Sequence, residues 1–488
     1  MRINVRQAIV LFTNILLLGG CFIGLLLFWN VSIAPESWCI YISWIAGILM
    51  CYQIIVMIML KYKYYEFVPW FIVLQFVFLY GRIFVKAIGH DQDISWRLFN
   101  AYSDLDCFKA ALFCIVYSQA IFTGIILGSR IVGKAKKNRN KNKVVIENDK
   151  YNSNAMAFIG WGILILTFPI KLYTNIQTIL AQRVYQAYSI SGDYNGVILV
   201  FGYIPTAGLI LLMCSKKYSK RTVIFGFVLY FIYELFYMIF SGDRRQEVIS
   251  LIVLVLCFCK LYGVKIKIRV LIPALVVAFI GLTFLAAIRS GRGDVVTSVS
   301  QYNSTFQKML GNNILVETLG EFGGTFFTVV STVAFYPKIN SYACGLTYIA
   351  SVLIIIPGLM TDLFPDVFLY GSISAACKRI TGQPLGGSLC MDMYGNFGLL
   401  GGLFAIVLGC VIGRLFVSYF YNKQSNYQIA NYYIFFFIIL NGVRAGIYEL
   451  TRPLAYTFIM IWAFAFVYRR ISKRGKVKVE KENGLAEI

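Results

Sequence analysis

Charged residues are scarce in this sequence of 488 residues. They make up 14% of the chain, whereas soluble domains carry about 25%, and 59% of the residues are hydrophobic. Apolar runs of about 20 residues, long enough to cross a bilayer, recur along the whole chain. A soluble globular fold is therefore excluded, and we predict an all-α, polytopic integral membrane protein.

Histidine occurs only once, at His90. A single histidine in a loop excludes a nucleophilic triad and disfavours a membrane acyltransferase, which needs a catalytic histidine inside a span. Walker and dinucleotide-binding glycine patterns are absent, which excludes soluble nucleotide chemistry. Together with Asp91 and Asp93, His90 resembles an acid-x-acid metal site, but the match is short. We expect no metal and no cofactor.

The twelve cysteines show no metal-binding spacing, and several lie in apolar runs, where a thiol behaves as a small hydrophobic group. Cys377 and Cys390 share one polar segment and could form a disulfide only if that segment lies outside the cytoplasm.

The 45 lysines and arginines outnumber the 22 aspartates and glutamates, which gives a net charge of +23. The lysines and arginines fall between the apolar runs, and no basic face with interleaved aromatics accompanies them, so we expect no nucleic-acid partner. Placing the most basic loops inside puts both termini in the cytoplasm, because the number of spans is even. We expect residues 129–150 to form a basic cytoplasmic loop and residues 469–488 a cytoplasmic tail.

Twelve apolar runs are predicted to cross the membrane. They lie near residues 8–28, 38–60, 67–88, 108–129, 155–174, 196–214, 222–240, 247–263, 270–288, 396–420, 429–447 and 453–468. Two weaker runs, at 323–336 and 344–360, would raise the number to fourteen if both cross. We expect residues 1–488 to form a single membrane domain. Its largest extracytoplasmic region, a loop or cap at 289–395, would hold these weaker runs as re-entrant segments or short spans.

Arginines recur at the outer ends of the predicted spans, on the side where positive charge is disfavoured. A guanidinium matches phosphate oxygens bidentately, so we predict that these arginines bind a lipid phosphate. The alternative is that each one anchors a helix at the interface or pairs with a neighbouring acid. The set comprises Arg244, Arg245, Arg289, Arg292, Arg444 and Arg452.

Acidic residues on the same side are candidates for a general base, which must lose its proton near neutral pH within reach of a hydroxyl. Asp392 is the first candidate and Glu321 the second. For either residue, a helix cap or an ion pair is the alternative interpretation.

Two segments of the sequence resemble a known family. These are AFYPKINSYACGLTYIASVLIIIPGLM, which contains Tyr348, and GGSLCMDMYGNFGLLGGLF, which contains Asp392, Tyr394 and Asn396. Both resemble the late part of Wzy-type polysaccharide polymerases, which join the repeat units of O-antigen and capsule. Two positions depart from that pattern. Asp392 stands where a glutamate is usual, and Gly358 stands where a basic residue often follows Ile-Pro, which leaves Arg379 as a substitute phosphate contact.

This resemblance implies a glycosyltransferase of the C-type superfamily in the bacterial cytoplasmic (inner) membrane, with its active site on the extracytoplasmic face. Such an enzyme transfers a growing glycan from polyprenyl pyrophosphate to the non-reducing end of a new lipid-linked repeat unit. The implied partners are the polyprenyl-pyrophosphate-linked oligosaccharide, membrane lipid, a chain-length regulator and a flippase. Tyr348, Tyr394 and Asn396 are then expected to contact substrate.

Two other functions fit parts of the pattern. An O-antigen ligase uses the same donor, but such ligases commonly carry a histidine in the large outer loop, and residues 289–395 contain none. A lipid-linked oligosaccharide flippase or exporter would place its arginines near the middle of the bilayer, whereas these lie at span ends.

Overall fold

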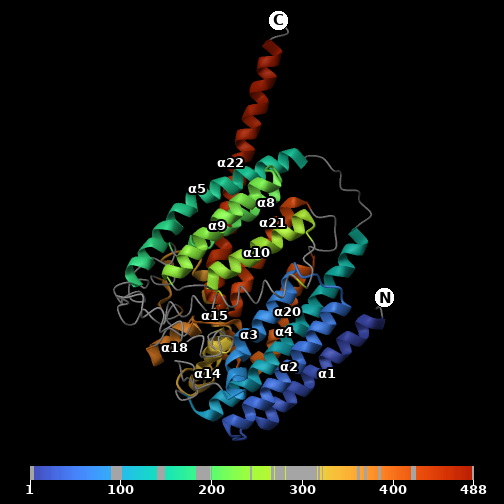
Figure 1. Cartoon of the computed structure of the whole chain (residues 1–488), viewed down its shortest axis with the longest axis vertical. Helices are drawn as coiled ribbons and strands as arrows, with labels where there is room; N and C mark the ends of the chain where they lie inside the picture. Colours follow the sequence, from blue (N-terminus) through green and yellow to red (C-terminus); the bar gives the residue numbers. More distant parts are fainter. Residues whose placement is uncertain are drawn as a thin grey trace. The chain divides into compact units, whose positions relative to one another are not determined.

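The computed structural model describes residues 5–89, 102–139, 149–182, 200–241, 245–264, 322–359, 371–382, 386–418 and 425–485, with a few single residues between these ranges. Every regular element in these ranges is a helix (Figure 1). The prediction of an all-α polytopic membrane protein is therefore confirmed.

Seven helices in the described ranges are long and apolar enough to cross a membrane. They are Ala8–Phe28, Pro35–Met59, Phe67–Ala87, Asp104–Ser129, Ser153–Leu180, Lys220–Ser241 and Ile447–Ser472. Shorter apolar helices at Ile204–Ser215, Gly323–Phe335 and Leu400–Phe416 coincide with other predicted runs. The run predicted at 270–288 lies outside the described residues, so the total of twelve to fourteen spans stays a prediction.

The chain forms two compact units that interleave along the sequence. Unit 1 comprises Met1–Asn142, Lys265–Asn422 and Ile439–Leu450. Its helices are α1 (Val5–Phe28), α2 (Pro35–Met59), α3 (Phe67–Ala87), α4 (Asp104–Arg139), η4 (Gly323–Thr325), α14 (Phe326–Phe335), α15 (Leu346–Leu353), α18 (Ile373–Thr381), α19 (Leu389–Phe397), α20 (Leu400–Ser418) and η5 (Asn441–Val443).

Unit 2 comprises Lys143–Val264, Lys423–Ile438 and Thr451–Ile488. It contains α5 (Asp149–Gln182), α8 (Ile204–Ser215), α9 (Lys220–Ser241), α10 (Arg245–Tyr262), most of α21 (Asn426–Leu440) and most of α22 (Ile447–Leu485). The basic segment 129–150 and the tail 469–488 continue α4 and α22 as far as Arg139 and Leu485 respectively.

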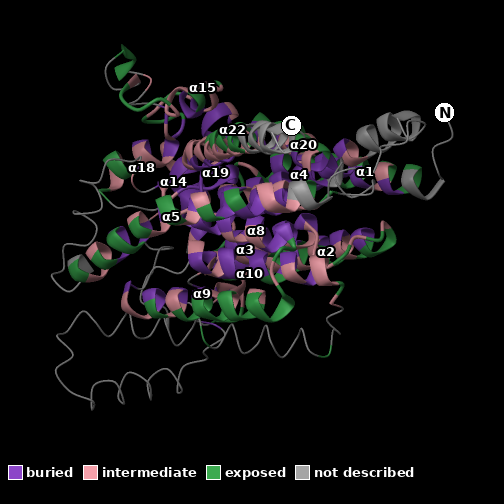
Figure 2. Ribbon diagram, turned by 90° about the horizontal axis from the view of Figure 1, so that it is seen from above, coloured by how far each residue is buried: buried purple, intermediate pink, exposed green. Residues whose placement is uncertain are grey.

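Helix α4 is the centre of unit 1. In its most apolar window 89% of the residues are buried, against 22% in α1, so α4 is surrounded by protein while α1 keeps a free outer face. Figure 2 shows the same contrast between the largely buried α3 and the exposed outer residues of α9. Ser103 caps α4, since its hydroxyl accepts a hydrogen bond from the N–H of Asp106 and donates one to the Asp106 carboxylate.

Glycines let α4 and α20 approach closely. A Cβ atom on Gly124 or Gly128 would overlap backbone of α20, and a Cβ atom on Gly409 or Gly413 would overlap carbonyl oxygens of α4. Each helix thus presents a Gly-x-x-x-Gly pair to the other. Small residues at this spacing are a common way for membrane helices to pack, because apolar burial gives little drive inside lipid.

Buried amides connect three helices of unit 1. Gln119 on α4 donates to the side-chain oxygen of Asn14 on α1, at 3.0 Å, and accepts from Gln53 on α2, at 3.1 Å. All three side chains are completely buried. Hydrogen bonds of this kind hold helices together at membrane depth.

Unit 2 contains a buried ion pair between Lys171 on α5 and Glu234 on α9. The hydroxyl of Tyr230 lies 3.3 Å from the Lys171 ammonium, and Glu247 is close enough to act on its charge. A single unpaired charge inside a bilayer is costly, so this pair ties α5 to α9.

Candidate active site

Helix α19 carries the leading catalytic candidate, and its start is fixed by Ser388. The Ser388 hydroxyl accepts from the N–H of Met391 at 3.1 Å and contacts the Thr328 hydroxyl of α14 at 3.0 Å. With nine residues, α19 is too short to cross a membrane, yet every residue from Leu389 to Asn396 is buried. It therefore forms a buried segment inside unit 1.

The end of α19 is also fixed. Gly398 has φ +57° and ψ −137°, a conformation that other residues rarely adopt, and a Cβ atom there would lie 2.8 Å from the ring of Tyr342. The N–H groups of Ala343 and Cys344 donate to the last carbonyl oxygens of the helix, at 2.9 and 3.0 Å. These bonds join the segment that contains Tyr348 to the segment that contains Asp392.

Asp392 lies where α19 meets the first turn of α22. Its Oδ2 atom accepts a 2.6 Å hydrogen bond from the N–H of Ile447, and a Cβ atom on Gly446 would lie 2.8 Å from the same oxygen. Gly387 packs in turn against Gly446, where a Cβ atom would lie 2.8 Å from the backbone nitrogen. Only glycines at these two positions allow the two segments to approach so closely around the carboxylate.

Burial raises the pKa of Asp392 to about 7, from an ordinary value of 3.8. The N–H of Ile447 opposes this rise by stabilising the ionised form, and the nearby Glu449 carboxylate adds to it. A carboxylate with this pKa exchanges its proton near neutral pH, which is what a general base requires.

Asn396 is completely buried and holds two segments of the site together. Its amide donates to Thr347 Oγ1 and to the carbonyl of Asp392, both at 2.7 Å, and its oxygen accepts from the N–H of Gly345 at 2.9 Å. The amide is therefore engaged within the protein, and its predicted contact with substrate stays a prediction.

Tyr394 lies in a cluster of aromatic rings. It stacks on Trp29, with ring centroids 6.3 Å apart, and meets Phe113 and Tyr342 edge to face, at 5.0 and 6.1 Å. Burial holds the pKa of Tyr394 above its ordinary value, so the phenol stays neutral. Tyr348, the other predicted tyrosine, stacks on Phe397 and donates to the sulfur of Met393.

The predicted arginines are divided between the two units. Arg444 follows η5 in unit 1, three residues before the N–H that binds Asp392, and the exposed Arg379 is in the last turn of α18. Arg245 begins α10 and Arg452 belongs to α22, both in unit 2. The remaining candidates, Arg244, Arg289, Arg292 and Glu321, lie outside the described residues, as does His90.

Both cysteines of the predicted polar segment are free thiols. Cys390 lies 3.9 Å from the sulfur of Cys114, and Cys377 contacts Thr332, so the two do not form a disulfide with each other. Among the described residues, no group of three histidine, cysteine, aspartate or glutamate side chains is placed to hold a metal ion.

Two cationic residues of unit 1 were not identified from the sequence. The ammonium of Lys109, on α4, lies 5.2 Å from the ring of Trp29, and the buried Arg82, on α3, faces the ring of Phe327 at 5.7 Å. Arg82 interrupts an apolar run and Lys109 lies at the start of one. A charge in such a position is the sequence signal that could have identified them. The lysine matters most here, because Trp29 connects it to Tyr394.

Comparison with known proteins decides the family. The sequence profile of the family described as O-antigen polysaccharide polymerase Wzy matches residues 8–475. The chain belongs to this family. It is thus a multi-pass membrane polymerase that acts on lipid-linked oligosaccharide repeat units, as the resemblance in its last third implied. No curated protein and no solved structure matches the chain.

Proposed function

We propose that this Wzy-family polymerase transfers the growing glycan from polyprenyl diphosphate to the non-reducing end of a new lipid-linked repeat unit, with Asp392 as the general base. Asp392 takes the proton of the acceptor hydroxyl as that oxygen bonds to the anomeric carbon of the donor. The bond between this carbon and the diphosphate oxygen breaks, and the polyprenyl diphosphate leaves with the electron pair.

The observation that carries this proposal is the setting of Asp392. A buried carboxylate with a pKa of about 7 is half ionised near neutral pH, and its contact with Ile447 fixes the direction in which the carboxylate points. One oxygen is held by this N–H, and the other oxygen is left for the acceptor hydroxyl. If Asp392 only capped α22, an asparagine would serve equally well, because its side-chain oxygen can also accept the N–H of Ile447.

Diphosphate needs positive charge to leave, and the arginines are proposed to supply it. Removing one well-placed donor to a developing negative charge typically costs about 3–4 kcal/mol of transition-state stabilisation. Arg444 is the leading candidate in unit 1, because only two residues separate it from Ile447, whose N–H binds the carboxylate. Arg244, Arg245, Arg289, Arg292, Arg379 and Arg452 remain candidates on the sequence pattern.

The reaction is proposed to take place on the outer face of the cytoplasmic membrane, with both termini inside. Cys344 offers a test, since it is exposed and its N–H binds the end of α19. In a variant with Cys344 as the sole cysteine, a membrane-impermeant maleimide should label intact cells. A cysteine placed at Ser472, near the end of the last span, should react only after the membrane is permeabilised. The reverse pattern would contradict the proposed orientation.

The test of the base compares two substitutions. Asp392→Asn keeps an oxygen for the Ile447 N–H but cannot take a proton, whereas Asp392→Ala loses both. We expect the asparagine variant to fold and bind lipid-linked donor without forming polymer. Normal polymer from Asp392→Asn together with instability of Asp392→Ala would instead assign the residue to capping alone.

A further inference from the structure

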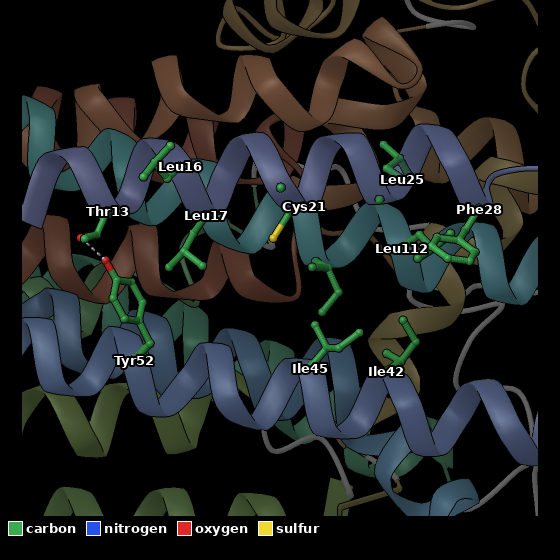
Figure 3. Close-up of a pocket in the computed structure, with 13 residues that line it drawn as sticks. Thr13, Leu16, Leu17, Cys21, Leu25, Phe28, Ile42, Ile45, Tyr52 and Leu112 are labelled. Carbon is green, nitrogen blue, oxygen red and sulfur yellow. Dashed lines mark hydrogen bonds between the residues drawn. The ribbon is translucent and has the colours of Figure 1, made fainter.

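A long apolar groove lies between α1 and α2, with α4 as its floor (Figure 3). Its volume is about 660 Å³. Leu17, Cys21 and Phe28 of α1 face Ile45 of α2 across it, and Leu112 of α4 lies at its base. Almost all of the lining is hydrocarbon, so the groove suits an apolar chain rather than a sugar.

The groove follows the axis of α1 and is bridged at one end. From Thr13 to Phe28 it covers fifteen steps of α1, about 22 Å at 1.5 Å per residue, which is most of the roughly 30 Å hydrocarbon core. A 2.9 Å hydrogen bond between Thr13 and the Tyr52 hydroxyl bridges the two helices at the Thr13 end. Behind it lies the amide network of Asn14 and Gln119. We therefore expect a chain that fills the groove to place its head group at the Phe28 end.

The Phe28 end leads to the candidate active site. Trp29 follows directly and stacks on Tyr394, which lies two residues after Asp392 on α19. Lys109 places its ammonium 5.2 Å from the Trp29 ring, at the same end. The head of a molecule in the groove would thus meet a cation first and the aromatic cluster beside the carboxylate next.

We propose that this groove binds the polyprenyl chain of the lipid-linked donor and that Lys109 contacts its diphosphate. The proposal rests on the transfer reaction proposed above. The donor, rather than the acceptor, is indicated by chemistry. In the donor the diphosphate is bonded to the reacting carbon, whereas in the acceptor it is separated from the reacting hydroxyl by the whole repeat unit. Only the donor's diphosphate belongs next to the base.

Three glycines of α1 allow a matched test. Gly20 and Gly24 line the groove, Gly19 does not, and a Cβ atom on any of the three would meet nothing within 4 Å. Gly20→Leu and Gly24→Leu should therefore fill the groove without disturbing the fold, while Gly19→Leu adds the same side chain on a lipid-facing surface. All three substitutions raise helix propensity by the same amount. A difference in binding between the variants therefore does not come from a difference in folding.

The first measurement is binding. Purified protein is irradiated with a polyprenyl diphosphate that carries a photoreactive group on its chain, and the adducts are mapped by mass spectrometry. We expect adducts on α1 and α2 in the wild-type and Gly19→Leu proteins and a loss of about tenfold in Gly24→Leu, because two displaced methylene groups are worth that factor. Equal labelling of all variants, or equal displacement by phospholipid, would overturn the proposal and leave only a surface for bulk lipid.

The second measurement is polymerisation with two donors. With a long-chain donor, Gly24→Leu should raise KM about tenfold and leave kcat nearly unchanged, and with a donor shortened to two isoprene units it should change neither. An equal effect on both donors would contradict chain binding in the groove. If the wild-type protein forms no polymer from either donor, the proposed reaction fails, while the labelling result still decides whether the groove binds the chain.

Discussion

The carboxylate of Asp392 accepts a 2.6 Å hydrogen bond from the backbone N–H of Ile447, 55 residues further along the chain. This bond joins the short buried helix α19 to the start of the long helix α22. It satisfies one oxygen of a carboxylate that burial makes hard to ionise, and it does so next to a second carboxylate, that of Glu449. The catalytic role and the capping role of Asp392 therefore make different, measurable demands on the protein.

The rate of polymerisation should depend on the ionisation of Asp392. Because a general base must be ionised, the rate should fall as the pH falls through about 7, with half of the maximal rate near that value. Initial rates measured between pH 5 and 9 with purified protein test this. A rate that stays constant from pH 9 down to pH 5 would mean that Asp392 is not the group that limits the reaction.

Replacing Asp392 with asparagine should stabilise the folded protein at high pH. The folded pKa of about 7 lies above the ordinary 3.8, so the carboxylate contributes its full stability only below about pH 4 and loses it as the pH rises toward 7. The difference corresponds to at most about 4 kcal/mol.

At pH 8, Asp392→Asn should thus unfold at a higher temperature than wild type, although we expect it to form no polymer. Thermal unfolding in detergent measures this. The unfolding temperature of Asp392→Asn should exceed that of wild type at pH 8, and the difference should disappear at pH 4. A loss of stability at both pH values would contradict it.

Asn396 should be needed for the fold of the site. Asn396→Leu leaves the N–H of Gly345 and the hydroxyl of Thr347 without their buried partner, which should cost about 2–4 kcal/mol. Thr347→Val removes only one of these bonds and should cost about 1 kcal/mol. Denaturant unfolding of both variants tests the order. Equal stability of Asn396→Leu and wild type would show that the bridge between the two motifs is dispensable.

Removing one partner of the ion pair in unit 2 should destabilise the folded protein, whereas replacing both partners should change its stability little. Lys171→Met leaves Glu234 buried without its counter-charge and should cost about 3–5 kcal/mol. Replacing both residues with methionine should recover most of this loss. A double variant less stable than Lys171→Met would mean that each residue has a separate partner that matters more.

The fold class could be predicted from the sequence because long apolar runs directly indicate membrane-spanning helices. Thus α1, α2 and α3 begin and end within a few residues of their predicted runs. The packing between helices was not accessible in the same way. The Gly124–Gly128 and Gly409–Gly413 pairs are visible as spacings, but only the structure brings them together.

Some residues that the sequence singles out are brought together by the structure, and their roles stay predictions. Asp392, Asn396 and Tyr348 do lie together, since the N–H groups of Ala343, Cys344 and Gly345 bind the end of α19. Trp29 and Lys109 were missed because their link to Tyr394 spans more than half of the chain. Lys171 and Glu234 lie inside predicted spans and not at their ends, where the predicted arginines lie, although a charge in an apolar run is itself a signal of function.

The most direct measurement is the balance of products from purified protein supplied only with lipid-linked repeat units. We predict a ladder of glycans with one polyprenyl diphosphate released for each linkage formed, and neither product from Asp392→Asn. A ladder that requires a nucleotide sugar, or a normal ladder from Asp392→Asn, would contradict the account.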